Sequence, residues 1–262
     1  MRIVFFGASK FGLRCLDDIR TIPGVELAGV VTVPQTFSIS YRPQGVKNVL
    51  HADFPSYAAQ HQIPCVVMQK TMAEPGLLET VRGWRPDFLL AVGWYHIIPR
   101  KFRDLARTGG LHASLLPDYS GNAPLVWAMI NGEDKTGITF FLFEEGVDSG
   151  PIIGQLEEPI HPDDTIATLY ERIEQRGVEL LRIHLPRLAD GTATFTPQDS
   201  SKRRIMPARS PEDGEIDLRK TGRELYNFIR AQSPPYPGAF LRTVDGKKLI
   251  IEKARLEDFG SA

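Results

Sequence analysis

The sequence predicts an α/β protein built on a mostly parallel sheet with helices on both faces, followed by a small carboxyl-terminal α+β subdomain. The chain has 262 residues, of which 42% are hydrophobic and 24% are charged, as expected of a globular protein with a sizeable core. Short apolar runs alternate with amphipathic helical segments over the first hundred residues, which is typical of a parallel sheet. The last quarter changes to a pattern of one helix and a hairpin.

The first hundred residues contain four strand candidates and three helix candidates. The strands are expected at residues 3–6, 27–33, 66–68 and 88–92, and the helices at 11–19, 57–61 and 77–82. Right-handed crossovers between such strands give a Rossmann-like sheet, in which ligands bind beyond the carboxyl ends of the strands. The first turn carries Gly7 and Gly12 but lacks the three-glycine dinucleotide fingerprint. We therefore interpret both glycines as allowing the first helix to pack close to the sheet.

The charge balance and the cysteines argue against several classes of protein. Lys and Arg number 31 against 32 Asp and Glu, so the chain lacks the cationic field of nonspecific nucleic-acid binding. Cys15 and Cys65 have no partners at zinc-ligand spacing, so we expect buried thiols and no metal. The amino terminus lacks a cleavable leader, and no apolar run approaches the ~20 residues needed to cross a bilayer. These features predict a cytoplasmic protein without a membrane partner.

Candidate chemistry concentrates between residues 109 and 153. A short strand at 111–113 places His112 at a strand end, and a strand at 138–143 runs into a loop that carries Asp148 between Gly146 and Gly150. The two glycines let this backbone turn sharply and approach a ligand. We expect His112 and Asp148 to meet as an acid–base couple, on neighbouring loops at the carboxyl edge of the parallel sheet.

A short helix is expected between these two loops. Asn122 is predicted to cap it, and Pro124 suits its first turn because a missing amide is not needed there. Asn131 and Gly132 are predicted to end it.

This segment resembles the catalytic core of the formyltransferases that use N10-formyltetrahydrofolate, and most closely that of methionyl-tRNA formyltransferase and the amino-sugar formyltransferases. The resemblance is carried by His112-Ala113-Ser114-Leu115-Leu116-Pro117, Tyr119, Gly121, Ala123-Pro124, Trp127, Asn131-Gly132-Glu133, Thr136-Gly137, Thr139 and Gly146-Val147-Asp148-Ser149-Gly150. Residues 90–99 resemble one wall of the family's pterin pocket, and parts of 216–240 resemble the opening of its carboxyl-terminal subdomain.

The resemblance implies that the protein is an enzyme that transfers a formyl group from the folate co-substrate to an amine. His112 would transfer a proton or hold the oxyanion, and Asp148 would orient the imidazole or relay a proton through water; these alternatives stay open. The residues implied to contact the folate are Val92, Tyr95, Ile97, Ser114, Leu115, Leu116, Pro117, Val147 and Asp148. Two roles stay open for His96: a contact with the co-substrate or the acceptor, or a structural hydrogen bond.

Gly110 departs from the family pattern and is included among the catalytic positions for that reason. The family carries an Asn there, two residues before the His, and its amide would donate to the formyl oxygen. Loss of such a donor costs ~10² to 10³ in rate. Three explanations stay open: a substitute donor such as Asn122 or water, a slow or altered enzyme such as a 10-formyltetrahydrofolate hydrolase, or a protein that binds folate without catalysis.

The sequence predicts a formyltransferase catalytic domain over residues 1–205 and a truncated carboxyl-terminal subdomain over 206–262. The expected elements are a helix at 166–181, a strand at 193–196, a basic connector at 200–209, a helix at 220–232 and a hairpin at 240–244 and 248–252. In methionyl-tRNA formyltransferases such a hairpin continues into a fuller β-barrel, and the resemblance does not lead us to expect that barrel in this subdomain.

The charge pattern predicts a small acceptor. Residues 207–262 hold ten Lys or Arg and nine Asp or Glu, and the loop predicted at 34–53 has Arg42 and Lys47 as its basic residues. A tRNA-binding module needs an excess of positive charge, so we expect a small-molecule amine, with methionyl-tRNA as the alternative acceptor. The amine could belong to a nucleotide-linked amino sugar, which the resemblance favours, or to an amino-acid-derived metabolite. Acceptor contacts are expected at residues 38–47, with Tyr41 and Arg42. A homodimer is compatible with this composition.

Overall fold

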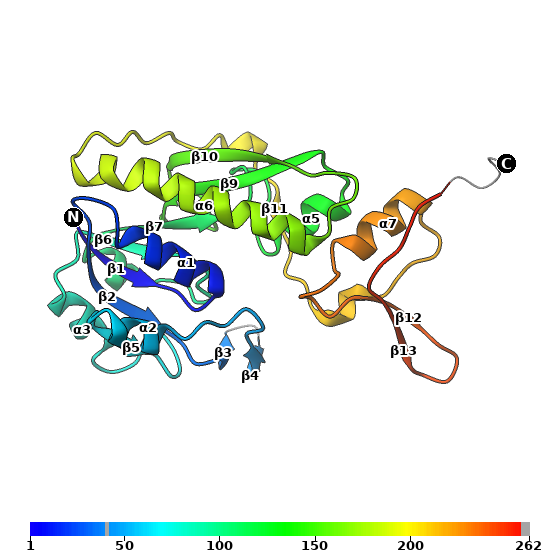
Figure 1. Ribbon diagram of the computed structural model, residues 1–262, viewed down its shortest axis with the longest axis horizontal. Coiled ribbons are helices and arrows are strands. Elements are labelled where there is room, and N and C mark those ends of the chain that lie inside the picture. The colour runs from blue at the N-terminus through cyan, green and yellow to red at the C-terminus, as the bar shows by residue number, and fades with distance from the viewer. Residues whose placement is uncertain (40–41, 258–262) are drawn as a thin grey trace. The chain divides into compact units, whose positions relative to one another are not determined.

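The computed structural model describes residues 1–39 and 42–257 (Figure 1). It divides into two compact units, each made of separate stretches of chain. The first comprises Met1–His112, Thr139–Gly154 and Gly177–Gln198, and the second comprises Ala113–Ile138, Gln155–Arg176 and Asp199–Ala262. The predicted domain division into residues 1–205 and 206–262 stays a prediction.

A mostly parallel sheet forms the centre of the first unit, as the sequence predicts. Its strands are β1 (Arg2–Phe6), β2 (Glu26–Thr32), β5 (Cys65–Val67), β6 (Phe88–Ala91), β7 (Arg107–His112), β9 (Lys135–Leu142) and β10 (Ile152–Pro159), the last two of which continue into the second unit. Within the described residues the strand order is β10-β9-β7-β6-β1-β2-β5. Pairing is parallel from β5 through β2, β1 and β6 to β7, whereas β7 and β9 are antiparallel.

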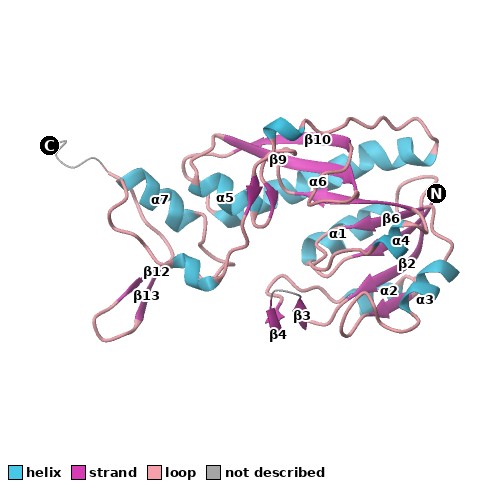
Figure 2. Ribbon diagram, turned by 180° about the vertical axis from the view of Figure 1, so that it is seen from behind, coloured by secondary structure: helices cyan, strands magenta, loops and turns pink. Residues whose placement is uncertain are grey.

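Helices cover both faces of this sheet (Figure 2). They are α1 (Lys10–Ile19), α2 (Phe54–Gln60), α3 (Leu77–Gly83), α4 (Arg100–Arg103) and the second half of α6 (Ile166–Ala189). On one face the ring of Phe5 stacks on Phe54 of α2, with ring centroids 6.1 Å apart. An ion pair between Asp18 of α1 and Arg182 joins α1 to α6 on that side.

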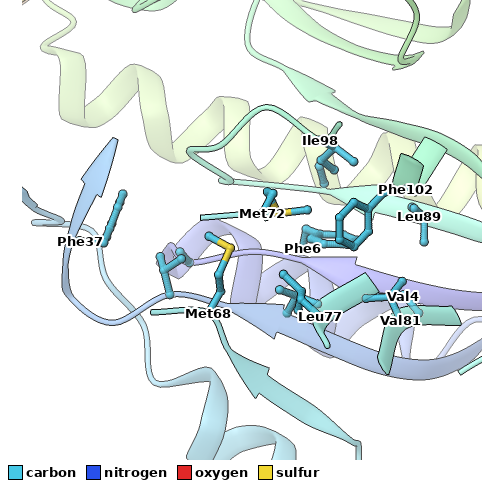
Figure 3. Packing of buried hydrophobic residues seen from close by; sticks show 14 of the residues in the cluster. Val4, Phe6, Phe37, Met68, Met72, Leu77, Val81, Leu89, Ile98 and Phe102 are labelled. Atoms are coloured by element: carbon cyan, nitrogen blue, oxygen red, sulfur yellow. The ribbon is translucent and has the colours of Figure 1, made fainter. Parts of the chain in front are cut away.

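A large hydrophobic core lies on the other face, against α3 and α4. Because successive strand residues point to opposite faces, Val4 and Phe6 reach this core while Phe5 does not. They pack with Leu77 of α3 and Phe102 of α4, as Figure 3 shows. Burial of each such side chain stabilises the fold by roughly 1.5–3 kcal/mol, and the rigid sheet that results positions the loops at its edges.

The close packing predicted for the first turn is confirmed. A Cβ atom at Gly12 would lie 2.6 Å from the carbonyl oxygen of Val92, and one at Gly7 would lie 3.0 Å from the same atom. Ser9 caps α1 by accepting a hydrogen bond from the Gly12 amide at 3.1 Å. The two glycines therefore bring the start of α1 against the end of β6.

In the second unit, β8 (Ser120–Gly121) pairs in parallel with β11 (Ile205–Met206), so part of the predicted connector is strand. The helix α5 (Pro124–Ile130) begins with Pro124 in its first turn and is followed by Gly132, as expected. The predicted cap is wrong: Ala123, with φ 49°, occupies that position and no side chain caps the helix. The left-handed backbone at Ala123 supplies the turn that an Asn122 cap was expected to make.

The end of the described chain confirms the predicted helix and hairpin. After the 3₁₀ turns η1 (Ser200–Lys202) and η2 (Pro211–Gly214), the chain forms α7 (Gly222–Arg230), β12 (Ala239–Arg242) and β13 (Lys248–Ile251). The two strands are antiparallel. Ile216, Ile229 and Ala239 form a small buried core beneath them.

Two segments differ from expectation. The predicted loop at 34–53 contains the antiparallel strands β3 (Thr36–Ile39) and β4 (Arg42–Lys47), and Tyr41, a predicted acceptor contact, lies outside the described residues. The strand predicted at 193–196 is reduced to one bridge between Thr196 and Ile152. Across residues 1–39 and 42–257, none of the helices combines the length and apolar character that crossing a membrane requires.

Candidate active site

The structure brings His112 and Asp148 together within the first unit. His112 is the last residue of β7, and its Nδ1 atom lies 3.6 Å from Oδ2 of Asp148. The two side chains are 12% and 24% exposed, so both are shielded yet accessible from solvent. This separation is an ion-pair distance and is longer than a direct hydrogen bond, as is common for catalytic pairs in ligand-free enzymes. The pair can orient an imidazole and move a proton.

The Asp148 loop reaches His112 by a route that the sequence does not predict. Because β9 runs antiparallel to β7, Leu142 at the end of β9 lies opposite Gly109, and Thr139 lies opposite His112. The loop therefore leaves the sheet beside Gly109 and folds back along β7 to reach His112. The expectation that both loops leave at the carboxyl edge of parallel strands is wrong, because β9 reverses direction.

Several contacts fix the conformation of this loop. The Leu142 amide donates to the carbonyl of Pro151 at 2.9 Å, and the Ser149 hydroxyl donates to the carbonyl of Glu145 at 2.8 Å. A Cβ atom at Gly150 would lie 1.9 Å from the Leu142 carbonyl oxygen, so this position requires glycine. Asp148 itself has φ 48°, a left-handed conformation that is uncommon for a residue with a side chain. These contacts and backbone angles hold the loop in a tightly folded conformation.

Gly110 is buried in β7, opposite Ala91 of β6. A Cβ atom there would lie 2.4 Å from the carbonyl oxygen of Ala91 and 2.8 Å from Cζ of Phe143. A side chain at this position therefore requires the backbone of β6 to move. The structure offers no place for an Asn donor at position 110, and a catalytic role for Gly110 stays a prediction.

The loop after β6 carries three of the residues predicted to contact folate. Val92 is completely buried, so a ligand could reach its side chain only if a neighbour moved. The Tyr95 hydroxyl donates to Oδ1 of Asn48 at 3.1 Å, and its ring lies 5.2 Å from that of Phe37. Ile97, by contrast, is 87% exposed. Ile97 thus gives the loop one exposed apolar side chain, whereas Val92 is buried and Tyr95 is held by Asn48.

His96 lies in the same loop, with its ring 5.5 Å from that of Trp94. Nε2 of His96 and Nε1 of Trp94 are buried and have no hydrogen-bond partner among the described residues. Burial lowers the pKa of His96, which favours its neutral form. The structural hydrogen bond considered for His96 is not formed at Nε2 in the part of the chain that the structure describes.

The Ser114–Pro117 segment belongs to the second unit and is held by internal contacts. The buried Ser114 hydroxyl donates to the Asp118 carbonyl at 2.7 Å, and the Leu116 carbonyl accepts from Nε2 of Gln155 at 2.8 Å. Leu115 packs closely against Gly137, where a Cβ atom would lie 2.5 Å from it. The contacts of these four residues with folate stay a prediction.

Two residues near the pair were not predicted. Phe143 fills the space beside Gly110, and Gln198 donates through Nε2 to the carbonyl of Asp148 at 2.8 Å. No local pattern points to Gln198, because it lies 50 positions along the chain from Asp148. Asn122, the predicted substitute donor, is exposed in the second unit, where its backbone N–H donates to the carbonyl of Met206 at 3.2 Å.

The fold is an α/β sheet in which an imidazole and a carboxylate meet at the end of β7. Family models identify the class of protein. The model described as formyl transferase matches residues 1–184, and the model described as formyl transferase, C-terminal domain, matches residues 209–262. The chain therefore belongs to the formyltransferase family, and it is an enzyme of that class.

Relatives of two kinds are similar to the chain. The methionyl-tRNA formyltransferase of Citrifermentans bemidjiense is 35% identical over 243 residues, which cover 92% of this chain and 74% of the relative. A sugar N-formyltransferase structure from a Shewanella species matches with a TM-score of 0.76 and 20% identity, over 98% of this chain and 99% of that one. An N-formyltransferase structure from Helicobacter canadensis, in complex with folinic acid and dTDP-3-aminofucose, matches with a TM-score of 0.68 and 20% identity, over 87% and 79% of the two chains. The structural matches confirm the fold.

Proposed function

We propose that the protein transfers the formyl group of N10-formyltetrahydrofolate to the amino group of a small acceptor, a nucleotide-linked amino sugar. The observation that carries the proposal is the shielded pair of His112 and Asp148, 3.6 Å apart, in a chain of the formyltransferase family. Formyl transfer to an amine needs a group that handles a proton near neutral pH, and imidazole beside a carboxylate provides one.

The reaction sets the tasks of the pair. The acceptor nitrogen attacks the formyl carbon, forming a new C–N bond while the carbonyl becomes an oxyanion and the nitrogen loses a proton. Collapse of this intermediate breaks the bond to N10, which takes up a proton and leaves as tetrahydrofolate. His112 accepts the proton or stabilises the oxyanion, and Asp148, 3.6 Å from the imidazole, orients it or relays the proton through water.

The loops of the first unit offer surface suited to a pterin. Ile97 is 87% exposed and Val147 is 52% exposed, so both apolar side chains are accessible to a ligand. The unbonded Nε2 of His96 is a polar atom that a bound heterocycle could satisfy. These features support the folate as the formyl donor, and we propose that residues 114–117 also contact it.

The charges of the carboxyl-terminal segment support a small acceptor. Residues 207–262 hold ten basic residues, and among the described ones ion pairs join Arg219 to Asp217, Lys220 to Glu224, Arg242 to Glu215, Lys247 to Asp245 and Arg255 to Glu257. Such pairing cancels the positive potential that a phosphate backbone would need. This favours an acceptor that carries one nucleotide at most.

Methionyl-tRNA is the second candidate acceptor, because the 35% identity to a methionyl-tRNA formyltransferase exceeds the 20% identity to the sugar enzymes. The deciding experiment supplies formyl-folate with either aminated nucleotide sugars or initiator methionyl-tRNA. We expect kcat/KM at least ~10-fold higher for a nucleotide-linked amino sugar. Faster formylation of the tRNA would identify the second candidate. Release of formate without any amine would identify a hydrolase, and stoichiometric folate binding without turnover would identify a binding protein.

The proposed compartment is the cytoplasm. Cys15 and Cys65 are not joined in a disulfide, as is typical of proteins that work in reducing surroundings; Cys15 is buried as predicted, whereas Cys65 is half-buried. Burial raises the pKa of the Cys65 thiol to about 11, so this residue resists oxidation rather than serving as a nucleophile. Fractionation of the native host cells would test this assignment.

A further inference from the structure

Gln198 joins a distant segment of the chain to the loop that carries Asp148. Its side-chain Nε2 donates to the carbonyl of Asp148 at 2.8 Å and to the carbonyl of Gly150 at 2.7 Å. One amide group thus uses both of its N–H donors on a single loop. All three residues belong to the first unit.

The orientation of this amide follows from its two acceptors. If the side chain were reversed, its Oε1 would face two carbonyl oxygens, which repel it. In the observed orientation Oε1 is buried and has no partner among the described residues. An unsatisfied buried oxygen costs stability. The two hydrogen bonds from Nε2 to the loop offset this cost and hold the side chain in its observed orientation.

The loop needs such a restraint, because it must fold back along β7 to bring Asp148 to His112. Asp148 has φ 48° and Gly146 has φ 103°, so the backbone on the way to the carboxylate is left-handed at two positions. A left-handed conformation at a residue with a side chain is unfavourable and persists where neighbours impose it. The two bonds from Gln198 bracket Ser149 and fix the backbone on both sides of it.

We propose that Gln198 is a positioning residue that holds the Asp148 carboxylate toward His112. This inference rests on the proposed function, in which the pair handles a proton. Gln198 does not face the reacting atoms in this assignment; it acts through the backbone of Asp148.

The test compares Gln198→Leu, which keeps the size but removes both donors, with Gln198→Glu, which sets a carboxylate against two carbonyl oxygens. Gln60→Leu, at the exposed end of α2, is the matched control. The first readout is hydrogen exchange of the peptide spanning residues 144–150. We expect exchange about tenfold faster in both Gln198 variants, with exchange elsewhere and the melting temperature close to those of the control.

The second readout is formyl transfer. We expect kcat to fall about tenfold or more in both Gln198 variants while KM for the amine changes less than about threefold. In an Asp148→Asn background, Gln198→Leu should add no further loss, because its effect runs through that carboxylate. An equal loss in that background would show a merely structural role and overturn the proposal, and so would unchanged kcat.

The two readouts separate this inference from the proposed function. If the wild-type protein formylates no amine, the proposed function fails, and unchanged exchange at residues 144–150 would then overturn the positioning role as well. If the wild type is active and His112 or Asp148 variants are impaired while Gln198 variants are not, the proposed function stands and the role of Gln198 is refuted.

Discussion

The backbone carbonyl of Ala91 occupies the place that a side chain at position 110 would need. A Cβ atom at Gly110 would lie 2.4 Å from this oxygen, well inside van der Waals contact, and the obstructing atom belongs to the neighbouring strand. The glycine is therefore a requirement of strand packing. Its presence where relatives are expected to carry Asn follows from how closely β6 and β7 approach and from Phe143 beside them.

Gly110→Ala should lower the free energy of unfolding by roughly 1–3 kcal/mol, because overpacking in a rigid core has costs of that order. Gly110→Asn should lose at least as much and should not raise the rate of formyl transfer. Urea denaturation and steady-state assays of the folded fraction measure both effects. Gly83→Ala is the control, since a Cβ atom there meets nothing within 4 Å. A stable Gly110→Asn protein with faster formyl transfer would contradict this prediction.

A buried ion pair in the second unit predicts an acid-dependent loss of stability. Burial alone would raise the pKa of the Asp164 carboxyl, but hydrogen bonds from Arg172 and Thr168 outweigh it and lower the pKa to about 2. Because the folded pKa lies below the ordinary value, the stabilisation is present above about pH 4 and is lost as the pH falls toward about 2. Asp164→Asn should therefore cost on the order of 2 kcal/mol at pH 7.

Urea denaturation at pH 7 and at about pH 3 checks this prediction. The difference between wild type and Asp164→Asn should shrink at the lower pH. Asp163→Asn, next to it and exposed, should change stability little at either pH. The same cost of Asp164→Asn at both values would mean that the carboxylate charge is not what stabilises this site.

Four strands of the parallel sheet were predictable because their sequences are continuous apolar runs, whereas β7, expected at 111–113, begins at Arg107. Residues 3–6, 27–33, 66–68 and 88–92 lie within a residue or two of β1, β2, β5 and β6. The β3–β4 hairpin was missed, since its segment contains Pro43 and Gly45, which are typical of loops. The cap of α5 was missed because propensity favours Asn122, whereas tertiary structure imposes a left-handed turn at Ala123.

The candidate site was predictable in its residues but not in its geometry. His112 and Asp148 stand out by residue type and motif, and the structure brings them together. Their approach depends on the antiparallel pairing of β7 and β9, which apolar patterns do not reveal because they carry no strand direction. Gln198 could not be identified at all, since its hydrogen bonds join positions 50 apart without a local signal.

The charge balance predicts weak and unspecific interaction with tRNA. Ten basic against nine acidic residues in positions 207–262, many of them paired, leave little net charge to release counterions from a phosphate backbone. Any affinity for initiator methionyl-tRNA should be low at physiological salt, whereas binding of a nucleotide-linked amino sugar should change little between low and physiological salt. Titrations of both ligands at two salt concentrations provide the measurement. Tight tRNA binding at physiological salt would contradict the small-acceptor assignment.

Single-turnover formyl transfer by His112→Ala, Asp148→Asn and the double variant tests the central claim most directly. If the two side chains act as one proton-handling unit, each single variant should lose ~10² to 10⁴ in rate, and the double variant should be little worse than the worse single. His61→Ala, at the end of α2, and Asp104→Asn, after α4, are matched controls that should retain nearly full activity. Near-wild-type rates in either single variant, with folding intact, would remove that residue from the mechanism and contradict the account.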